Sequence, residues 1–146
     1  MNYQINYSME KDPEFKMFIQ NKIKQFNRES SDAFKELTEE KIKPFHVSVE
    51  DSNEMLVGGL TGRVIWDWLE VDYFWLSPEV RGKGIGEDIL KKAEKEAVLL
   101  GVTKILLTTF EFQARSFYEK YGYEVVGEVK DYPPGTTYYT MVKTIN

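Results

Sequence analysis

The sequence predicts a single mixed α/β (α+β) domain over residues 1–146, and three observations support this fold class. Segments with apolar residues at helical spacing alternate with strand-like segments along the chain. A glycine-rich loop, residues 80–86, lies between a strand-like segment and a helical one. The length of 146 residues, without repeats or low-complexity linkers, is typical of one domain with its own hydrophobic core.

The N-terminal elements are predicted from alternation and from a capping signal. Residues 3–8 alternate between apolar and polar side chains and are expected to form an edge strand. Asp12 is expected to cap a helix that has Pro13 at its first position. Residues 30–43 are ambiguous, and one interpretation is a short helix that ends before Pro44. The long helix carries its apolar residues on one face: Phe15, Phe18, Ile19, Ile23 and Phe26.

The central elements are predicted from apolar runs and turn residues. Residues 45–50 and 55–65 are expected to be strands joined by a polar turn, and residues 69–76 form the next strand. After the glycine-rich loop, apolar residues at helical spacing predict a helix that runs to Leu100. Gly101 is positioned to end this helix in a left-handed conformation.

The C-terminal elements continue the alternation of strands and helices. Residues 104–109 are expected to be a strand, residues 112–121 a helix, and Gly122 its C-terminal cap. Residues 124–130 and 138–145 are expected to be strands joined by a turn that contains two prolines and a glycine. Because two helices each lie between strands, this part of the sheet is expected to be locally parallel.

The glycine-rich loop is expected to bind an anion. Gly82, Gly84 and Gly86 leave the first backbone N–H groups of the following helix uncovered by side chains. These groups lie at the positive end of the helix dipole, and Arg81 and Lys83 add positive charge. A site of this kind is suited to a phosphate or pyrophosphate.

The spacing of the loop residues narrows the choice of cofactor. The dinucleotide-binding spacing fails, because Glu87 stands where a third glycine would follow Gly82 and Gly84, and the P-loop spacing also fails. Arg81, Gly84 and Gly86 fit the pattern Arg/Gln-x-x-Gly-x-Gly/Ala, which resembles the acetyl-CoA-binding motif of the GNAT (GCN-five-related) N-acetyltransferases. The alternative is a turn that only connects strand and helix.

A second segment resembles the same family. Residues 114–123 are similar to the family's helix of the pattern Ala-x-x-Phe-Tyr-Glu-Lys-x-Gly-Phe/Tyr, and the order of elements is also that of the family. The resemblance is clear from Leu56 to the C-terminus. It implies a GNAT-type acyl-CoA N-acyltransferase fold, with a mixed, twisted and splayed sheet of about six or seven strands flanked by about four helices.

The resemblance implies transfer of an acetyl group from acetyl-CoA to a primary amine by direct attack in a ternary complex. In the family, backbone donors of the splayed strand stabilise the charge that develops on the carbonyl oxygen. Here that strand end comprises Phe74, Trp75 and Leu76. The pyrophosphate of the cofactor would bind the loop and the helix start, which comprise Arg81, Gly82, Lys83, Gly84, Ile85, Gly86 and Glu87.

Tyr118 matches the tyrosine that the family often uses as a general acid toward the departing thiolate. A phenol with a pKa of ~10 is a weaker acid than a thiol with a pKa of ~8.5, so full proton transfer is uphill by roughly 2 kcal/mol. Tyr118 is therefore expected to act mainly by donating a hydrogen bond to the sulfur. The alternative is core packing, since Ala114, Phe117 and Tyr121 share its helical face.

Glu70 and Asp72 are the candidates for removing a proton from the acceptor. They alternate with apolar residues and are expected to lie on one face of the strand that leads to the cofactor. An ammonium with a pKa of ~10.4 cannot lose its proton directly to a carboxylate with a pKa of ~4, because the mismatch is roughly 8 kcal/mol. Burial of the carboxylate or a water chain is needed, and a solvated or ion-paired strand face remains the alternative.

One position departs from the family pattern. Many relatives have asparagine seven residues before the helix tyrosine, whereas this chain has Glu111 there. Any amide contact transferred from the family is therefore in doubt, although Gln113 could replace it.

Composition bounds the cofactors, partners and location. The chain has no cysteine and a single histidine, His46, so no metal site is expected. The net charge of −5 disfavours nucleic-acid binding, and no signal peptide or membrane-spanning run is present in the sequence, so a cytoplasmic protein is expected. A homodimer is compatible with exposed strand edges.

The acceptor and two alternative functions stay open. The acceptor is expected to be a small-molecule or peptide amine of unidentified structure. The alternatives to an enzyme are a non-catalytic acyl-CoA-binding module and an interaction domain without cofactor. Several aromatic residues could line an acceptor pocket or belong to the core: Trp66, Trp68, Trp75, Tyr132, Tyr138 and Tyr139.

Overall fold

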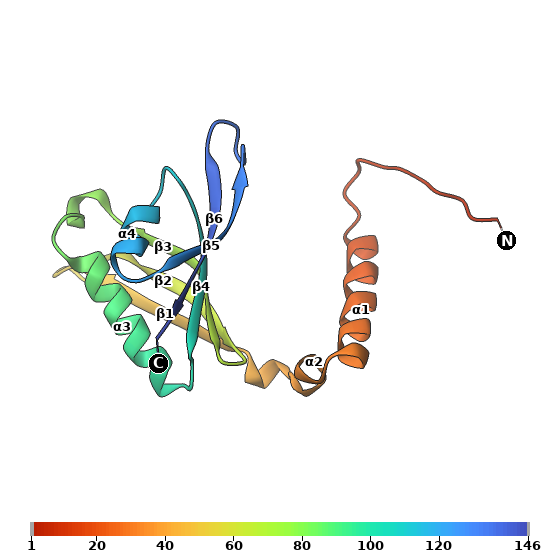
Figure 1. Cartoon of the computed structure of the whole chain (residues 1–146), viewed down its shortest axis with the longest axis horizontal. Coiled ribbons are helices and arrows are strands. Elements are labelled where there is room, and N and C mark those ends of the chain that lie inside the picture. Colours follow the sequence, from red (N-terminus) through yellow and green to blue (C-terminus); the bar gives the residue numbers. More distant parts are fainter. Residues whose placement is uncertain (1, 146) are drawn as a thin grey trace. The chain divides into compact units, whose positions relative to one another are not determined.

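A computed structural model describes residues 2–145 of the chain (Figure 1). The chain divides into two compact units, Met1–Leu37 and Thr38–Asn146. The prediction of one domain over residues 1–146 stays a prediction. No helix among the described residues is both long enough and apolar enough to cross a membrane.

The N-terminal unit consists of an extended segment and two helices, α1 (Pro13–Ser30) and α2 (Asp32–Glu36). The predicted cap is confirmed, because the Asp12 carboxylate accepts a hydrogen bond from the backbone N–H of Phe15 at 2.9 Å. The predicted strand at residues 3–8 is wrong, since this segment contains no strand. Alternation stabilises a strand only where another strand pairs with it, and none of the six strands pairs with residues 3–8.

The ambiguous segment 30–43 contains α2 and a single 3₁₀ turn, η1 (Glu39–Lys41). Strand β1 (Lys43–Glu50) follows and includes Pro44. A proline is tolerated there because β1 is the edge strand of the sheet and has only one neighbour.

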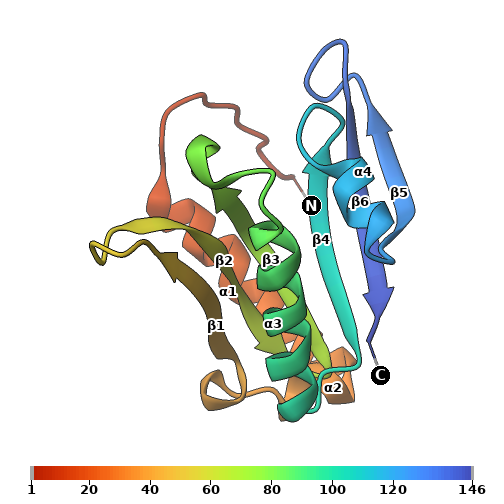
Figure 2. The same cartoon turned by 90° about the vertical axis from the view of Figure 1, so that its left-hand side faces the viewer.

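The second unit is built on a six-stranded mixed sheet with the order β1-β2-β3-β4-β6-β5 (Figure 2). All neighbours are antiparallel except β3 and β4, so the predicted parallel pairing is confirmed there. It does not extend to β5, because β6 lies between β4 and β5. The remaining strands are β2 (Leu56–Ile65), β3 (Trp68–Leu76), β4 (Lys104–Phe110), β5 (Glu124–Lys130) and β6 (Thr137–Thr144).

Helix α3 (Ile85–Leu99) connects β3 to β4 and covers one face of the sheet (Figure 2). Gly101 follows it with φ 86°, as expected for a left-handed cap. The core lies between α3, α4 and the sheet, and its best buried members include Leu69, Ile89, Leu90, Ala93, Ala97, Ile105 and Met141.

Helix α4 (Arg115–Lys120) is shorter than the predicted helix over residues 112–121. The Gln113 side-chain oxygen accepts hydrogen bonds from the Phe110 backbone N–H at 2.9 Å and from the Thr109 hydroxyl at 3.3 Å. The Gln113 backbone N–H also donates to the Phe110 backbone oxygen at 2.9 Å, and this local bonding holds residues 111–114 as a turn. Gly122, with φ 94°, follows the helix as predicted.

Candidate functional site

The candidate site is a cleft between the C-terminal halves of β3 and β4. The two strands pair over only three residue pairs, Trp68–Lys104, Leu69–Ile105 and Glu70–Leu106. Beyond them β4 stays paired with β6 as far as Phe110, but it separates from β3. The gap forms a cavity of about 1080 Å³. Backbone groups of β3 that point into the gap have no strand to pair with among the described residues.

A β-bulge in β3 coincides with the start of this separation. Thr61 of β2 faces Tyr73, whereas the next residue, Gly62, faces Val71, so Asp72 is an extra residue in β3. Glycine is required at position 62, because a Cβ atom there would collide with the backbone of β3. The bulge therefore depends on a residue of the neighbouring strand.

The bulge shifts the alternation of side chains along β3 by one residue. Leu69 packs in the core before the bulge, and Phe74 and Leu76 pack against the core after it. The extra residue interrupts the alternation at Asp72 itself, so the prediction that Glu70 and Asp72 share one face stays a prediction. Asp72 lines the cleft, whereas Glu70 is not among the lining residues.

Glu70 forms an ion pair with Arg63 of β2 at 3.0 Å, and both side chains are partly exposed. This arrangement corresponds to the ion-paired strand face that the sequence left open. Removal of either partner is expected to have a small effect on stability, because exposed ion pairs contribute little.

The glycine-rich loop bounds the cleft on the face of the sheet that α3 and α4 cover. Gly84 caps α3 with φ 81°, and no side-chain hydrogen bond covers the helix N-terminus. At Gly86 a Cβ atom would lie 3.1 Å from the Phe117 ring, so a small residue allows α3 and α4 to approach. The Arg81 Nε donates to the Leu76 backbone oxygen at 2.9 Å, which ties the loop to the end of β3.

Positive charge at this side of the cleft comes from Arg81 and Lys120. One carboxylate, Glu87, also lines it. Its side chain is held by Lys91 at 2.8 Å and by the Tyr121 hydroxyl at 3.1 Å, and these hydrogen bonds lower the pKa of Glu87. The negative charge is thus partly neutralised where an anion would bind.

Tyr118 lies on α4 with its ring in the core, and the residue is 6% exposed. The ring makes edge contacts with Phe74, Phe117 and Tyr123 at centroid distances of 6.1, 5.5 and 5.7 Å. Burial raises the pKa of Tyr118 to about 12, so the hydroxyl keeps its proton at neutral pH. Tyr118 lines the cleft, and its hydroxyl has no hydrogen-bond partner within residues 2–145. The Tyr118 ring thus packs in the core, and the residue also lines the cleft.

The face of the sheet opposite α3 contributes aromatic rings to the cleft. Phe110 and Tyr138 are cross-strand partners on β4 and β6. Their neighbours Thr109 and Tyr139 are buried on the helix-covered face, so Phe110 and Tyr138 point to the other face. We call the lining residues Arg81, Gly84, Gly86, Glu87, Phe117, Tyr118, Lys120 and Tyr121 the helix side, and Phe110, Phe112, Tyr132 and Tyr138 the aromatic side.

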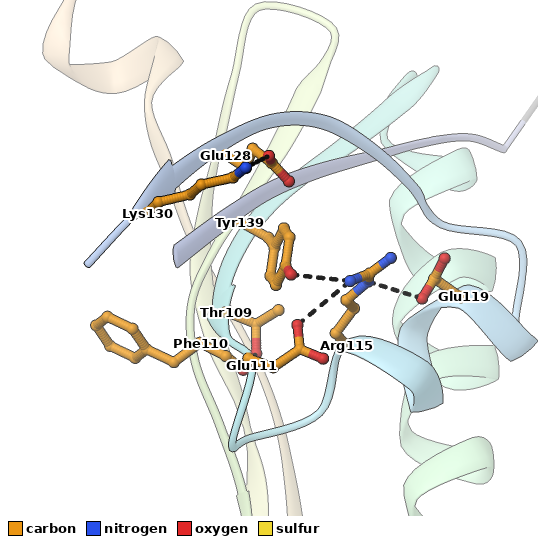
Figure 3. Close-up of polar contacts among 8 residues, drawn as sticks. All are labelled: Thr109, Phe110, Glu111, Arg115, Glu119, Glu128, Lys130 and Tyr139. Carbon is orange, nitrogen blue, oxygen red and sulfur yellow. Dashed lines mark hydrogen bonds and ion pairs between the residues drawn. The ribbon is translucent and has the colours of Figure 1, made fainter. Parts of the chain in front are cut away.

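An arginine connects α4 to the sheet beside the cleft (Figure 3). The Arg115 guanidinium donates to the Tyr139 hydroxyl at 2.8 Å, and it pairs with Glu111 at 3.3 Å and Glu119 at 3.0 Å. Hydrogen bonding from Tyr139 and Arg115 lowers the pKa of Glu111. Glu111, the residue at the family's asparagine position, therefore pairs with the Arg115 guanidinium. Gln113 provides the amide contact to the backbone.

Most of the sequence-predicted site residues border this one cleft. Among the predicted cofactor contacts, Lys83 and Ile85 are absent from the lining, and Ile85 packs against the core instead. The sequence missed Lys120 and the aromatic pair Phe110 and Phe112. The cleft is bordered by these predicted residues: Asp72, Phe74, Trp75, Leu76, Arg81, Gly82, Gly84, Gly86, Glu87 and Tyr118.

Comparisons with known sequences agree with this geometry. A family model described as the acetyltransferase (GNAT) family matches residues 8–123. The blasticidin-S acetyltransferase of Streptomyces morookaense is 40% identical over 91 residues, which are 62% of this chain and 67% of that protein.

Solved structures show the same fold. The 1.9 Å crystal structure of an acetyltransferase from Bacillus cereus ATCC 14579 has a TM-score of 0.80 and 30% identity, and the match covers 95% of this chain and 97% of that one. An aminoglycoside 6′-N-acetyltransferase complexed with coenzyme A has a TM-score of 0.64 at 19% identity, over 94% of this chain and 96% of that one. The predicted fold class and the resemblance drawn from the two motifs are confirmed.

Proposed function

Because the chain belongs to the acetyltransferase (GNAT) family, we propose that its cleft transfers an acetyl group from acetyl-CoA directly to a primary amine in a ternary complex. Family membership makes the protein an acyltransferase. The observation that carries the more detailed proposal is the cleft itself, which is lined from both faces of the sheet and contains the Tyr118 side chain. Two ligands that approach from opposite faces could meet there.

The helix side fits the phosphates of acetyl-CoA. The start of α3 has no covering side chain at Gly84, and Arg81 and Lys120 supply positive charge. The edge of β3 that faces the gap at residues 72–76 has no strand partner on that side, and it offers hydrogen bonds to an extended arm and to the acetyl oxygen. We assign the phosphate contacts to the backbone of residues 81–87, with Lys83 and Ile85 contributing through the main chain only.

Tyr118 is assigned as the hydrogen-bond donor to the sulfur that leaves. Its hydroxyl is protonated at neutral pH, and it lines the cleft without another partner among the described residues. A phenol with a pKa raised to about 12 is a still weaker acid than a free tyrosine. Donation of a hydrogen bond is therefore favoured over complete proton transfer.

Asp72 is assigned to the acceptor amine in preference to Glu70. The bulge places Asp72 in the cleft lining, whereas Glu70 is paired with Arg63. An exposed carboxylate attracts an ammonium but cannot remove its proton directly, because the pKa mismatch is about 8 kcal/mol. We therefore infer that Asp72 orients the acceptor and that water accepts the proton.

The 40% identity to a blasticidin-S acetyltransferase makes blasticidin S the first acceptor to test. A peptide amine and other small-molecule amines belong in the same panel.

The test combines ligand binding with turnover. Millimolar acetyl-CoA should raise the melting temperature, because a ligand at about 100 times its Kd stabilises the folded state by about 2.7 kcal/mol. At least one amine should then cause consumption of acetyl-CoA and formation of an acetylated product. A melting shift without consumption would favour a non-catalytic acyl-CoA-binding module, and no shift at all would contradict the proposed cosubstrate.

A further inference from the structure

The aromatic side of the cleft is a cluster of neighbouring rings from two separate parts of the chain, the end of β4 with its following turn and the β5–β6 hairpin. Phe110 ends β4, Phe112 lies in the turn after it, and Tyr132 and Tyr138 belong to the β5–β6 hairpin. Phe110 lies 4.9 Å from Tyr138 and 6.4 Å from Tyr132, measured between ring centroids. In Figure 3 the Phe110 ring points away from Arg115, into the space opposite α4.

The arrangement of these rings differs from that of a core. Phe112 is 67% exposed and Tyr132 is 58% exposed, although both line the cleft. Phe110 and Phe112 are stacked at 5.3 Å with an interplanar angle of 2°. Contiguous exposed rings at the edge of a cleft are typical of a surface that binds a ligand.

The charge at this side is different from that on the helix side. The lining cations Arg81 and Lys120 and the carboxylate of Glu87 belong to the helix side, whereas the second lining carboxylate, Asp72, comes from the bulge of β3. Ring faces attract cations and stack on other flat rings. A carboxylate in the lining of the same cleft adds attraction for a protonated amine.

We propose that Phe110, Phe112, Tyr132 and Tyr138 form an acceptor subsite that stacks against a flat, unsaturated ring, and that Asp72 receives the amine attached to this ring. The inference rests on the proposed function, because it assigns the acceptor class of the same cleft. The subsite should make the protein prefer amines with a flat ring over amines with a puckered ring. Acetyl transfer to amines in general does not require this preference.

The experiment uses two amines that differ in ring flatness. Benzylamine and cyclohexylmethylamine have the same carbon skeleton, and their rates are compared at equal concentrations of the unprotonated amine. We expect the full-length protein to favour benzylamine in kcat/KM by about tenfold, since one or two aromatic contacts contribute on this scale. Phe112→Leu and Tyr132→Leu should each reduce this preference to about threefold or less, with the KM for acetyl-CoA unchanged.

Trp68→Leu is the matched control. Trp68 is an aromatic residue of β3 and lies where β3 and β4 are still hydrogen-bonded to each other. It is not among the residues that line the cleft. Its replacement should leave the preference for benzylamine intact. The melting temperature of each variant shows whether the variant is folded.

Binding of benzylamine, followed by NMR titration in the presence of coenzyme A, separates this inference from the proposed function. Weaker binding in Phe112→Leu supports the subsite even if no amine is acetylated, and in that case only the proposed reaction fails. Equal kcat/KM for the two amines, or equal benzylamine affinity in Phe112→Leu and the unmodified protein, would overturn the subsite. A rise in the KM for acetyl-CoA instead would assign the rings to the cosubstrate and overturn it as well.

Discussion

The helix side and the aromatic side of the cleft are built from different parts of the polypeptide. On the helix side the main features are backbone: a helix N-terminus at Gly84, a close helix approach at Gly86 and an unpaired strand edge. On the aromatic side the main features are side chains from β4, its following turn and the β5–β6 hairpin. Backbone recognition depends on a few glycines in a fixed order, whereas side-chain recognition can change one residue at a time. The difference explains why a motif can point to the proposed cosubstrate but contains no information on the acceptor.

The largest expected effect comes from a change to the backbone of the helix side. Gly84→Val places a branched side chain at φ 81° and over the first N–H groups of α3. The KM for acetyl-CoA should rise about 100-fold, because hydrogen bonds to a charged group contribute about 1.5–3 kcal/mol each. Gly101→Val is the matched control, with φ 86° and equally open surroundings at the other end of α3. Similar KM values in the two variants would show that the helix N-terminus does not bind the cosubstrate.

The second effect concerns Tyr118, the hydrogen-bond donor of the helix side. Tyr118→Phe should lower kcat about 30-fold and leave the KM for acetyl-CoA unchanged, because only the hydroxyl is lost. Tyr123→Phe is its control: this buried tyrosine donates to Glu94 at 3.1 Å, so its loss should reduce stability and not kcat.

The pKa of Tyr118 adds a test by pH. Because burial raises this pKa to about 12, the hydroxyl stays protonated while pH rises through 10, and the rate should not fall there through this group. A loss of activity with an apparent pKa of ~10 that disappears in Tyr118→Phe would contradict the assignment.

The third effect compares the two carboxylates of β3. Asp72→Asn should lower kcat/KM for the amine about tenfold, because the charge that attracts the ammonium is removed. Glu70→Gln should change it less than twofold, since Glu70 is paired with Arg63 and does not line the cleft. Steady-state kinetics with one amine and saturating acetyl-CoA check both. A larger loss in Glu70→Gln would reverse the assignment of the two residues.

The smallest effect is expected at the arginine that ties α4 to β6. Arg115→Met removes the hydrogen bond to Tyr139 and should lower the free energy of unfolding by about 1 kcal/mol. Because α4 carries Tyr118 and would be held less firmly against β6, kcat should fall about threefold. The KM for acetyl-CoA should not change. Lys92→Met, which breaks an exposed ion pair with Glu96, should alter neither quantity measurably. Equal unfolding curves for the two variants would show that Arg115 holds nothing in place.

The sequence predicts the helix side well, because its signals are local. The glycine spacing, the apolar face of α3 and the position of Tyr118 each lie within one short segment. Most strand and helix positions follow from the same local patterns.

Features that depend on distant segments could not be predicted. The extra residue at Asp72 reflects a register shift in the pairing of β2 with β3. An alternating pattern within β3 contains no information about the register of the neighbouring strand. The error at residues 3–8 has the same origin, since alternation does not supply a pairing partner. The aromatic side is brought together only when β4 and the β5–β6 hairpin become neighbours.

The separation of β3 from β4 beyond Glu70 has a consequence for association between copies of the protein. A strand edge on the outside of a sheet can recruit strands of other chains and lead to aggregation. Here the open edge lies inside the sheet, between two strands that are both held by outer neighbours. This inner edge faces the cavity of about 1080 Å³, which has the size of a small-molecule site. The chain thus keeps an inner edge free for a ligand, whereas the edges that other chains could pair with are the outer ones, at β1 and β5.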